Sequence, residues 1–394
     1  MKYCLILLAM ATILGKTGLH AQSNLDNVLS TVATNNKTFK AQSQYWEAQK
    51  ASYKTGLSPT DPVVGFDYMI GSPATAGNQT DLTVTQLLDF PTAYAKKQQL
   101  SEAQTGQAQW QVQAARRDLL LETKKVCLNL VYHRQLQTAL ARRLARAEQL
   151  RDDFQRKMDK GDGNVLDLNK ARLQWVAIQQ ESQENRLAIS VLESQLVALN
   201  GGTALEFTDS IYPLATNIGS FESLEKEIES ADPMRNLLAQ EVTIAQKELE
   251  VSKALKLPRL EVGYHYQGIL GQSYNGVHTG VSVPLWEHRN TTELRQVEIA
   301  VAGLELQDHL NAHYFEIKEL YGRFKSIESA METYRALLTD LNSETLLTKA
   351  LALGQISVIE YFMELSYYYD AHNTLLSMER EYQLVLADLL KHRL

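Results

Sequence analysis

The histidine and cysteine side chains are the candidates for metal binding and disulfide formation in this chain, and their spacing limits both. His265 and His278 fall on two consecutive segments of alternating polarity, but two histidines without a third ligand in view do not make a metal site. Cys127 lies on an apolar helical face, where a single cysteine forms neither a structural zinc site nor an intrachain disulfide, so we expect a small core residue. The chain has no G-x-S-x-G, HExxH, C-x-x-C or glycine-rich phosphate-binding motif. We therefore predict a protein that is not an enzyme and that has neither a cofactor nor a metal site.

Two acids, Asp167 and Glu360, occupy equivalent positions in an internal repeat. They are 193 positions apart (360 − 167), and Pro91 and Pro284 share the same offset (284 − 91). An equal spacing from proline to acid in both halves indicates two copies of one unit. We predict that each copy contains a helix, two strands, a very long helix and a shorter return helix.

Each of these acids follows a short turn motif. The first turn is Gly161-Asp162-Gly163-Asn164 and the second is Gly354-Gln355-Ile356-Ser357. The leading glycines permit the left-handed residue that ends a long helix. Asn164 with Asp167, and Ser357 with Glu360, predict capping boxes that satisfy the free N–H groups where the chain reverses. A role in capping alone stays open beside any functional role.

The elements that position these turns are long helices. The 8 prolines leave the stretches from Thr92 to Tyr212 and from Leu285 to Leu394 without any, so both must be mostly helical. The helical pattern runs to about residue 160 and about residue 353, and at 1.5 Å per residue each would be a rod of roughly 100 Å. In the second copy an apolar residue recurs every seven positions, as in a packed coiled coil, at Leu310, Ile317, Phe324, Met331 and Leu338. Return helices are expected over Val165–Leu199 and Val358–His392.

Four segments alternate with a period of two and predict two hairpins, with strands at about 63–71 and 81–89, and at about 260–269 and 277–285. One predicted face carries Phe66, Tyr68, Tyr264 and Tyr266. The other carries Asp67, Glu261, His265, Gln267 and His278. This length and alternation are typical of outer-membrane barrel strands, and a small soluble sheet on a coiled coil is the alternative. Four strands cannot close a barrel and lipid tolerates no open edge, so strands in a membrane require several chains; three would supply twelve strands.

Residues 1–21 resemble a secretory signal, with a positive start at Lys2, a short apolar core and Ala21 before the cut. The apolar core is too short for the roughly 20 residues that cross a bilayer, which argues against a membrane anchor. Removal of this segment would take away Cys4, Lys2 and Lys16 and change the net charge from −7 to −9, which excludes a typical nucleic-acid binder. We expect one repeat over 22–199, a polar linker over 200–220 and the second repeat over 221–394. Its first helix, over Phe221–Leu257, should contain a cap at Asp232.

The whole mature chain resembles the TolC-type outer-membrane efflux proteins. The two turns, continued as Val165-Leu166-Asp167-Leu168 and Val358-Ile359-Glu360-Tyr361, are similar to that family's G-x-x-[ST]-x-x-[DE]-[VL] pattern. Lys256-Leu257-Pro258-Arg259-Leu260 is similar to its helix-to-strand step. The sequence departs from the family's commoner pattern at Asn164, Glu360 and Met363. A ring of acidic side chains after these turns would therefore contain fewer acids than is common in the family.

The resemblance implies a mainly α-helical homotrimer in which a long coiled-coil barrel continues a shared 12-stranded β-barrel. It also implies an outer-membrane location with the helical part in the periplasm, a periplasmic adaptor and an inner-membrane pump as partners, and passive exit of exported compounds or ions. By position, Asp167 and Glu360 would form a gate at the tunnel entrance, and Gly161 to Asn164 and Gly354 to Ser357 would contact the adaptor. The aromatic strand face would meet outer-membrane lipid and the polar face would line the barrel lumen, although plain solvation of the polar face stays open. A non-conducting periplasmic coiled-coil scaffold is the competing interpretation of the same pattern.

Overall fold

A computed structural model describes residues 24–213, 218–340 and 343–394, and the expected signal segment lies outside them. The described part of the chain is mainly helical, with four strands in one antiparallel sheet. The helices are α1 Asn24–Asn35, α2 Lys37–Tyr53, α3 Pro91–Asp159, α4 Val165–Leu199, α5 Phe221–Ala231, α6 Pro233–Ala254, α7 Thr291–Asp340, α8 Ser343–Ala352 and α9 Val358–Leu389. The strands are β1 Val63–Met69, β2 Gln79–Leu88, β3 Arg259–Ile269 and β4 Gln272–Ser282. The predicted duplication is confirmed, because two helices, a hairpin, a long helical segment and a return helix follow one another twice.

The chain folds as two compact units that do not coincide with the two repeats. The first unit combines Met1–Lys37, Leu120–Asn217 and Phe324–Asp388, and the second combines Thr38–Leu119, Ile218–Arg323 and Leu389–Leu394. Each unit therefore takes segments from both copies. The sheet lies in the second unit, and both turns that carry the predicted acids lie in the first.

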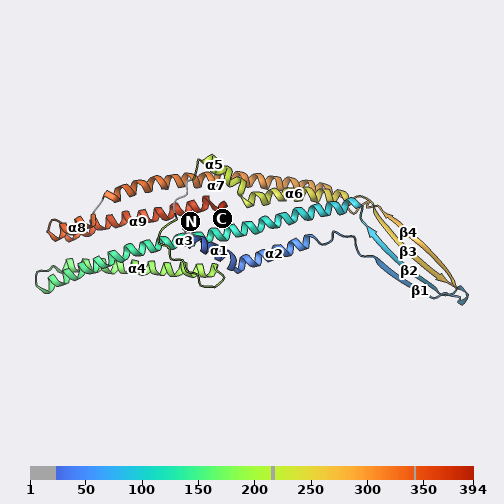
Figure 1. The fold of residues 1–394 in the computed structure, drawn as a ribbon, viewed down its shortest axis with the longest axis horizontal. Coiled ribbons are helices and arrows are strands. Elements are labelled where there is room, and N and C mark those ends of the chain that lie inside the picture. The colour runs from blue at the N-terminus through green and yellow to red at the C-terminus, as the bar shows by residue number, and fades with distance from the viewer. Residues whose placement is uncertain (1–23, 214–217, 341–342) are drawn as a thin grey trace, which may run out of the picture. The chain divides into compact units, whose positions relative to one another are not determined.

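The sheet has the order β1-β2-β3-β4, in which β2 pairs with β3 and joins the two hairpins (Figure 1). The β4 strand begins five residues earlier than predicted. Leu270 and Gly271 both have positive φ, 49° and 77°, and form a two-residue turn, so Gln272 already pairs with Ile269. The sequence 272–276, expected as a loop, thus extends the ladder, and β4 ends at Ser282.

Several predicted helices are shorter or interrupted. The single helix expected before the strands of the first copy is two helices, α1 and α2. They are divided at Asn36, a buried residue whose Nδ2 donates to the Leu199 carbonyl at 2.8 Å. The stretch over 221–257 is divided at Asp232, which caps α6 as predicted. The second long helix begins at Thr291 instead of Leu285, because Asn290 has a φ of 63°, outside the right-handed helical region. It is described as α7 and α8, with residues 341–342 outside the described part.

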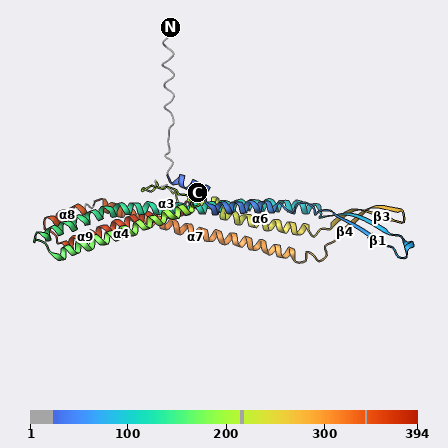
Figure 2. The same cartoon turned by 90° about the horizontal axis from the view of Figure 1, so that it is seen from below.

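In the first unit the helices pack through apolar seams. Phe324 and Met331, two of the predicted seven-residue positions, are buried there, and Cys127 is buried as expected. Figures 1 and 2 show α3 and α4 side by side, and Leu140 and Ile178 form a buried cluster between them. Among the described helices, none is both long enough and apolar enough to pass through a membrane.

Candidate functional site

One face of the sheet gathers apolar side chains. Phe66 lies opposite Leu82, and Leu82 lies opposite Tyr266, so these three residues share one row across β1, β2 and β3. Tyr264 lies in the next row on the same face, opposite Val277 of β4. Phe66 is 65% exposed and Val277 is 81% exposed. A soluble protein seldom leaves an apolar sheet face so open, and such a surface marks a site of contact with lipid or protein.

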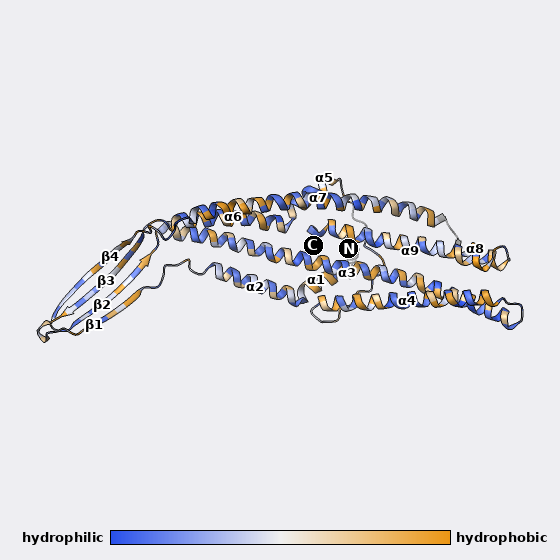
Figure 3. Cartoon of the chain, turned by 180° about the vertical axis from the view of Figure 1, so that it is seen from behind, coloured by the Kyte–Doolittle hydropathy of each residue, from blue (hydrophilic) through white to orange (hydrophobic). Residues whose placement is uncertain are grey.

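The opposite face gathers the polar residues that the sequence singled out. Asp67, Asp81 and Gln267 form one cross-strand row, and His265 lies in the adjacent row opposite Thr83. His278 Nε2 lies 3.6 Å from Glu261 Oε1 across β3 and β4. The register therefore places all five predicted polar residues on one face and the four predicted aromatic residues on the other. Figure 3 shows apolar and polar residues mixed along the same strands.

The two turns in the first unit end the helices before them, α3 and α8, with the same hydrogen bonds. Gly161 N donates to Met158 O at 3.0 Å and Asp162 N to Lys157 O at 3.0 Å. At the second turn Gly354 N donates to Leu351 O at 3.1 Å, with the neighbouring bond from Gln355 N to Ala350 O at 2.9 Å. This is the Schellman pattern, and the φ values of 82° at Gly161 and 71° at Gly354 explain the glycines. The offset of 193 positions is thus repeated bond for bond.

The following helices are capped differently. Ser357 N donates to Glu360 Oε2 at 2.7 Å and Glu360 N donates to Ser357 Oγ at 3.2 Å, which confirms the second capping box. The hydrogen bond from the Ser357 backbone, followed by that from its side chain, lowers the pKa of Glu360. The first predicted box is wrong. Asn164 Oδ1 accepts from Leu166 N at 3.0 Å, while the carboxylate of Asp167 lies 3.8 Å from Lys170 Nζ, because aspartate is one methylene shorter than the glutamate that a capping box uses.

Apolar contacts bring the two turns together. Phe154 of α3 and Leu168 of α4 form a buried cluster, and Val358 and Phe362 from the start of α9 pack against it. Ile356, in the second turn, packs against the neighbouring cluster around Tyr361. The two turns therefore form one end of the first unit, with Asp167 and the exposed Glu360 at the start of their return helices.

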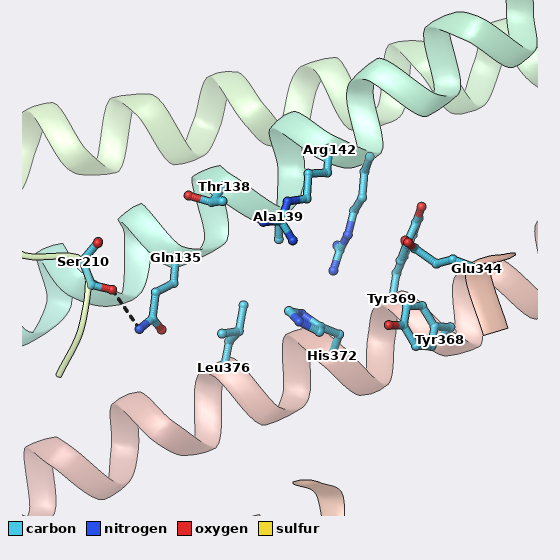
Figure 4. Close-up of a pocket in the computed structure, with 11 residues that line it drawn as sticks. Gln135, Thr138, Ala139, Arg142, Ser210, Glu344, Tyr368, Tyr369, His372 and Leu376 are labelled. Carbon is cyan, nitrogen blue, oxygen red and sulfur yellow. Dashed lines mark hydrogen bonds between the residues drawn. The ribbon is translucent and has the colours of Figure 1, made fainter. Parts of the chain in front are cut away.

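A cavity of about 360 Å³ in the first unit is lined mainly by α3, α8 and α9. Figure 4 shows Arg142 on α3 facing His372 and Leu376 on α9. Burial, and then the charge of Arg143, lower the pKa of His372. In the described part of the chain, His372 Nδ1 is buried without a hydrogen-bond partner, and Figure 4 shows Ser210 beside Gln135, away from His372. The cavity thus offers charged groups but no nucleophile paired with a base.

The sequence interpretation missed a cluster in the second unit formed by Asp232, His309 and His313. One ligand atom from each lies within 4.8 Å of the others, and among the described residues this is the group with metal-ligand geometry. The four-residue spacing of the two histidines on a helix was the signal available in the sequence. Asp232 was predicted only as a helix cap.

Comparison with solved structures finds the same fold in outer-membrane channels. A membrane protein from Pseudomonas aeruginosa has a TM-score of 0.78 at 14% identity, with 94% of each chain covered. The CmeC outer membrane channel of Campylobacter jejuni has a TM-score of 0.71 at 15% identity and covers 94% of this chain and 85% of its own. VceC, an outer membrane protein of Vibrio cholerae, has a TM-score of 0.73 at 12% identity and covers 93% of this chain and 95% of its own. No protein-family model matches the chain, and no curated protein sequence matches it.

These similarities establish a shared fold. The chain has the fold of TolC-type outer-membrane efflux channels, as the resemblance in its sequence predicted. Long helices with a small antiparallel sheet are common to all of them.

Proposed function

We propose that this chain is the outer-membrane channel of a tripartite efflux system. In this role it is a passive exit duct for compounds or ions that an inner-membrane pump delivers, directly or through a periplasmic adaptor. It catalyses no reaction, and the pump supplies the energy. The observation that supports the proposal best is the four-stranded sheet, which has the four predicted aromatic residues on one face and the five predicted polar residues on the other.

The edges of the sheet support a trimer. β1 and β4 each have one neighbour in the described sheet and would present unpaired N–H and C=O groups to lipid. Lipid tolerates no such edge. Pairing β1 of one chain with β4 of the next, three times, closes twelve strands into a barrel in the outer membrane and leaves the helical part in the periplasm.

The two faces of the sheet then contact lipid and water, respectively. Phe66, Tyr68, Tyr264 and Tyr266 contact lipid, and the polar set Asp67, Glu261, His265, Gln267 and His278 lines a water-filled lumen. Polar lumen residues carry little cost in such barrels, whereas a charge on the lipid side costs about 2–4 kcal/mol at the bilayer midplane.

The two turns contact the adaptor, and the acids that follow them form the gate. Gly161 to Asn164 and Gly354 to Ser357 lie at one end of the first unit, where a partner reaches them, and Asp167 and Glu360 begin the helices behind them. Three-fold symmetry makes rings of these carboxylates that favour cations and help keep the entrance closed.

The test of membrane insertion compares one lysine on each face of the sheet. Phe66→Lys should abolish assembly in outer-membrane fractions, whereas Thr83→Lys, on the polar face, should assemble and conduct in planar bilayers. Equal assembly of both variants, or a native protein that is a monomer in the soluble periplasm, would instead favour the scaffold.

The test of the gate measures single-channel conductance. Asp167→Ala combined with Glu360→Ala should raise it, and Glu184→Ala, which removes an exposed acid further along α4, should leave it unchanged. An unchanged conductance in the double variant would remove the gate assignment.

A further inference from the structure

Asp232, His309 and His313 bring one carboxylate and two imidazoles together in the second unit. His309 Nε2 lies 2.9 Å from Asp232 Oδ2. The two imidazole rings stack with centroids 5.3 Å apart and an angle of 16° between their planes. Two imidazoles and a carboxylate are a common ligand set of zinc and of neighbouring transition metals.

The backbone brings all three residues close together. His309 and His313 are four residues apart on α7 and so lie on one face of that helix. Asp232 is held by the start of α6, where its carboxylate accepts from Met234 N at 3.2 Å and from Arg235 N at 3.1 Å. The carboxylate is therefore held in place, whereas the imidazole rings, whose planes are nearly parallel, must turn about their side-chain bonds before both direct a nitrogen at one ion.

A second layer orients the carboxylate. Arg117 Nη1 donates to Asp232 Oδ1 at 2.8 Å, on the oxygen that His309 does not contact. Arg117 also lies 2.9 Å from Asp118, so two carboxylates share its positive charge. Partners of this kind orient metal ligands and tune their affinity.

The surroundings favour a cation and give it access. A cavity of about 330 Å³ opens beside His313 and is lined by the carboxylates of Glu225 and Glu229.

We propose that Asp232, His309 and His313 bind a divalent transition-metal ion, with water from the cavity completing its coordination. Tetrahedral bonds of about 2.0–2.1 Å place ligand atoms about 3.3 Å apart, so the contact between His309 and Asp232 opens by about 0.4 Å. The ion takes the place of the hydrogen in that contact, so the neutral His309 imidazole binds through Nε2 and carries its hydrogen on Nδ1. The bound ion joins the α5–α6 junction to α7. This site is independent of the proposed channel function.

The experiment titrates Zn²⁺ into the full-length mature protein, purified with EDTA and then transferred to metal-free detergent buffer, and follows binding by calorimetry. One ion per chain is expected. Changes to second-layer partners already weaken metal sites 10–100-fold, so His309→Ala and His313→Ala should each weaken binding by at least about 100-fold. His278→Ala, in the sheet, is the matched control and should bind as the native protein does.

Substitution with Co²⁺ separates loss of a ligand from loss of fold. The native protein should give the strong visible absorption of a tetrahedral site, and His313→Gln should lose it while keeping the native far-UV circular dichroism. Absence of stoichiometric binding, or binding that persists in His309→Ala and His313→Ala, would overturn the proposal.

Discussion

Replacement of Asp232 by alanine tests how firmly one buried carboxylate holds the start of α6. Asp232 is 3% exposed, caps the helix through two amides and pairs with Arg117. Loss of a cap costs about 1 kcal/mol, and breaking a buried ion pair while one partner stays costs about 3–5 kcal/mol. Because Arg117 keeps Asp118 as a partner, we take the low end of that range and expect the free energy of opening α6 to fall by about 3–4 kcal/mol.

Two further variants separate these contributions. Asp232→Asn keeps an oxygen that can cap α6 but removes the charge, so its loss should be smaller than that of Asp232→Ala by about 1 kcal/mol. Asp118→Asn removes the outer partner of Arg117. The Asp118 side chain is 64% exposed. Exposed ion pairs contribute little, so this control should change the opening free energy by less than about 0.5 kcal/mol.

Hydrogen–deuterium exchange of the peptide that covers residues 233–240, measured with EDTA present, reports the opening free energy directly. Asp232→Ala should lower its protection by about 100- to 1000-fold, since 1.4 kcal/mol corresponds to tenfold. A decrease of less than about tenfold would refute the energetic reasoning. Equal effects of Asp118→Asn and Asp232→Asn would refute the role assigned to burial.

Three smaller perturbations address the turns and the C-terminus. Ser357→Ala removes the cap of α9 and should lower the protection of that helix's first turn about fivefold, or about 1 kcal/mol; an unchanged exchange rate would contradict the cap. Gly163→Ala places a Cβ 2.6 Å from the backbone nitrogen of Met158 and should destabilise the first turn by about 1–3 kcal/mol, which limited proteolysis of the turn would reveal. Hydrogen bonds from Arg393, and then from the neighbouring histidine, lower the pKa of Glu227 to about 2. The stabilisation that the ionised Glu227 carboxylate contributes is therefore complete above the unfolded-state pKa of about 4.3 and is lost as the pH falls through about 2. Hydrogen exchange at the C-terminus should accelerate in that window beyond its intrinsic rate. Glu227→Gln should show no such acceleration.

The sequence by itself determined the duplication, the element types and the two faces of the sheet. These features repeat locally: prolines and glycines mark where helices must stop, and a period of two fixes which side chains share a strand face. Phe66 and Asp67 could be assigned to opposite faces because neighbouring residues of a strand point in opposite directions. The start of α4 at Val165 was equally predictable, since Asn164 is a strong capping residue.

The tertiary structure decided what depends on distance through space. The pairing of β2 with β3 joined the two hairpins into one sheet, and the positive φ angles at Leu270 and Gly271 lengthened β4 beyond its periodic part. Asp232 and His309 meet only because α6 and α7 pack together, 77 positions apart in sequence, and that contact turns a helix cap into the centre of a candidate metal site.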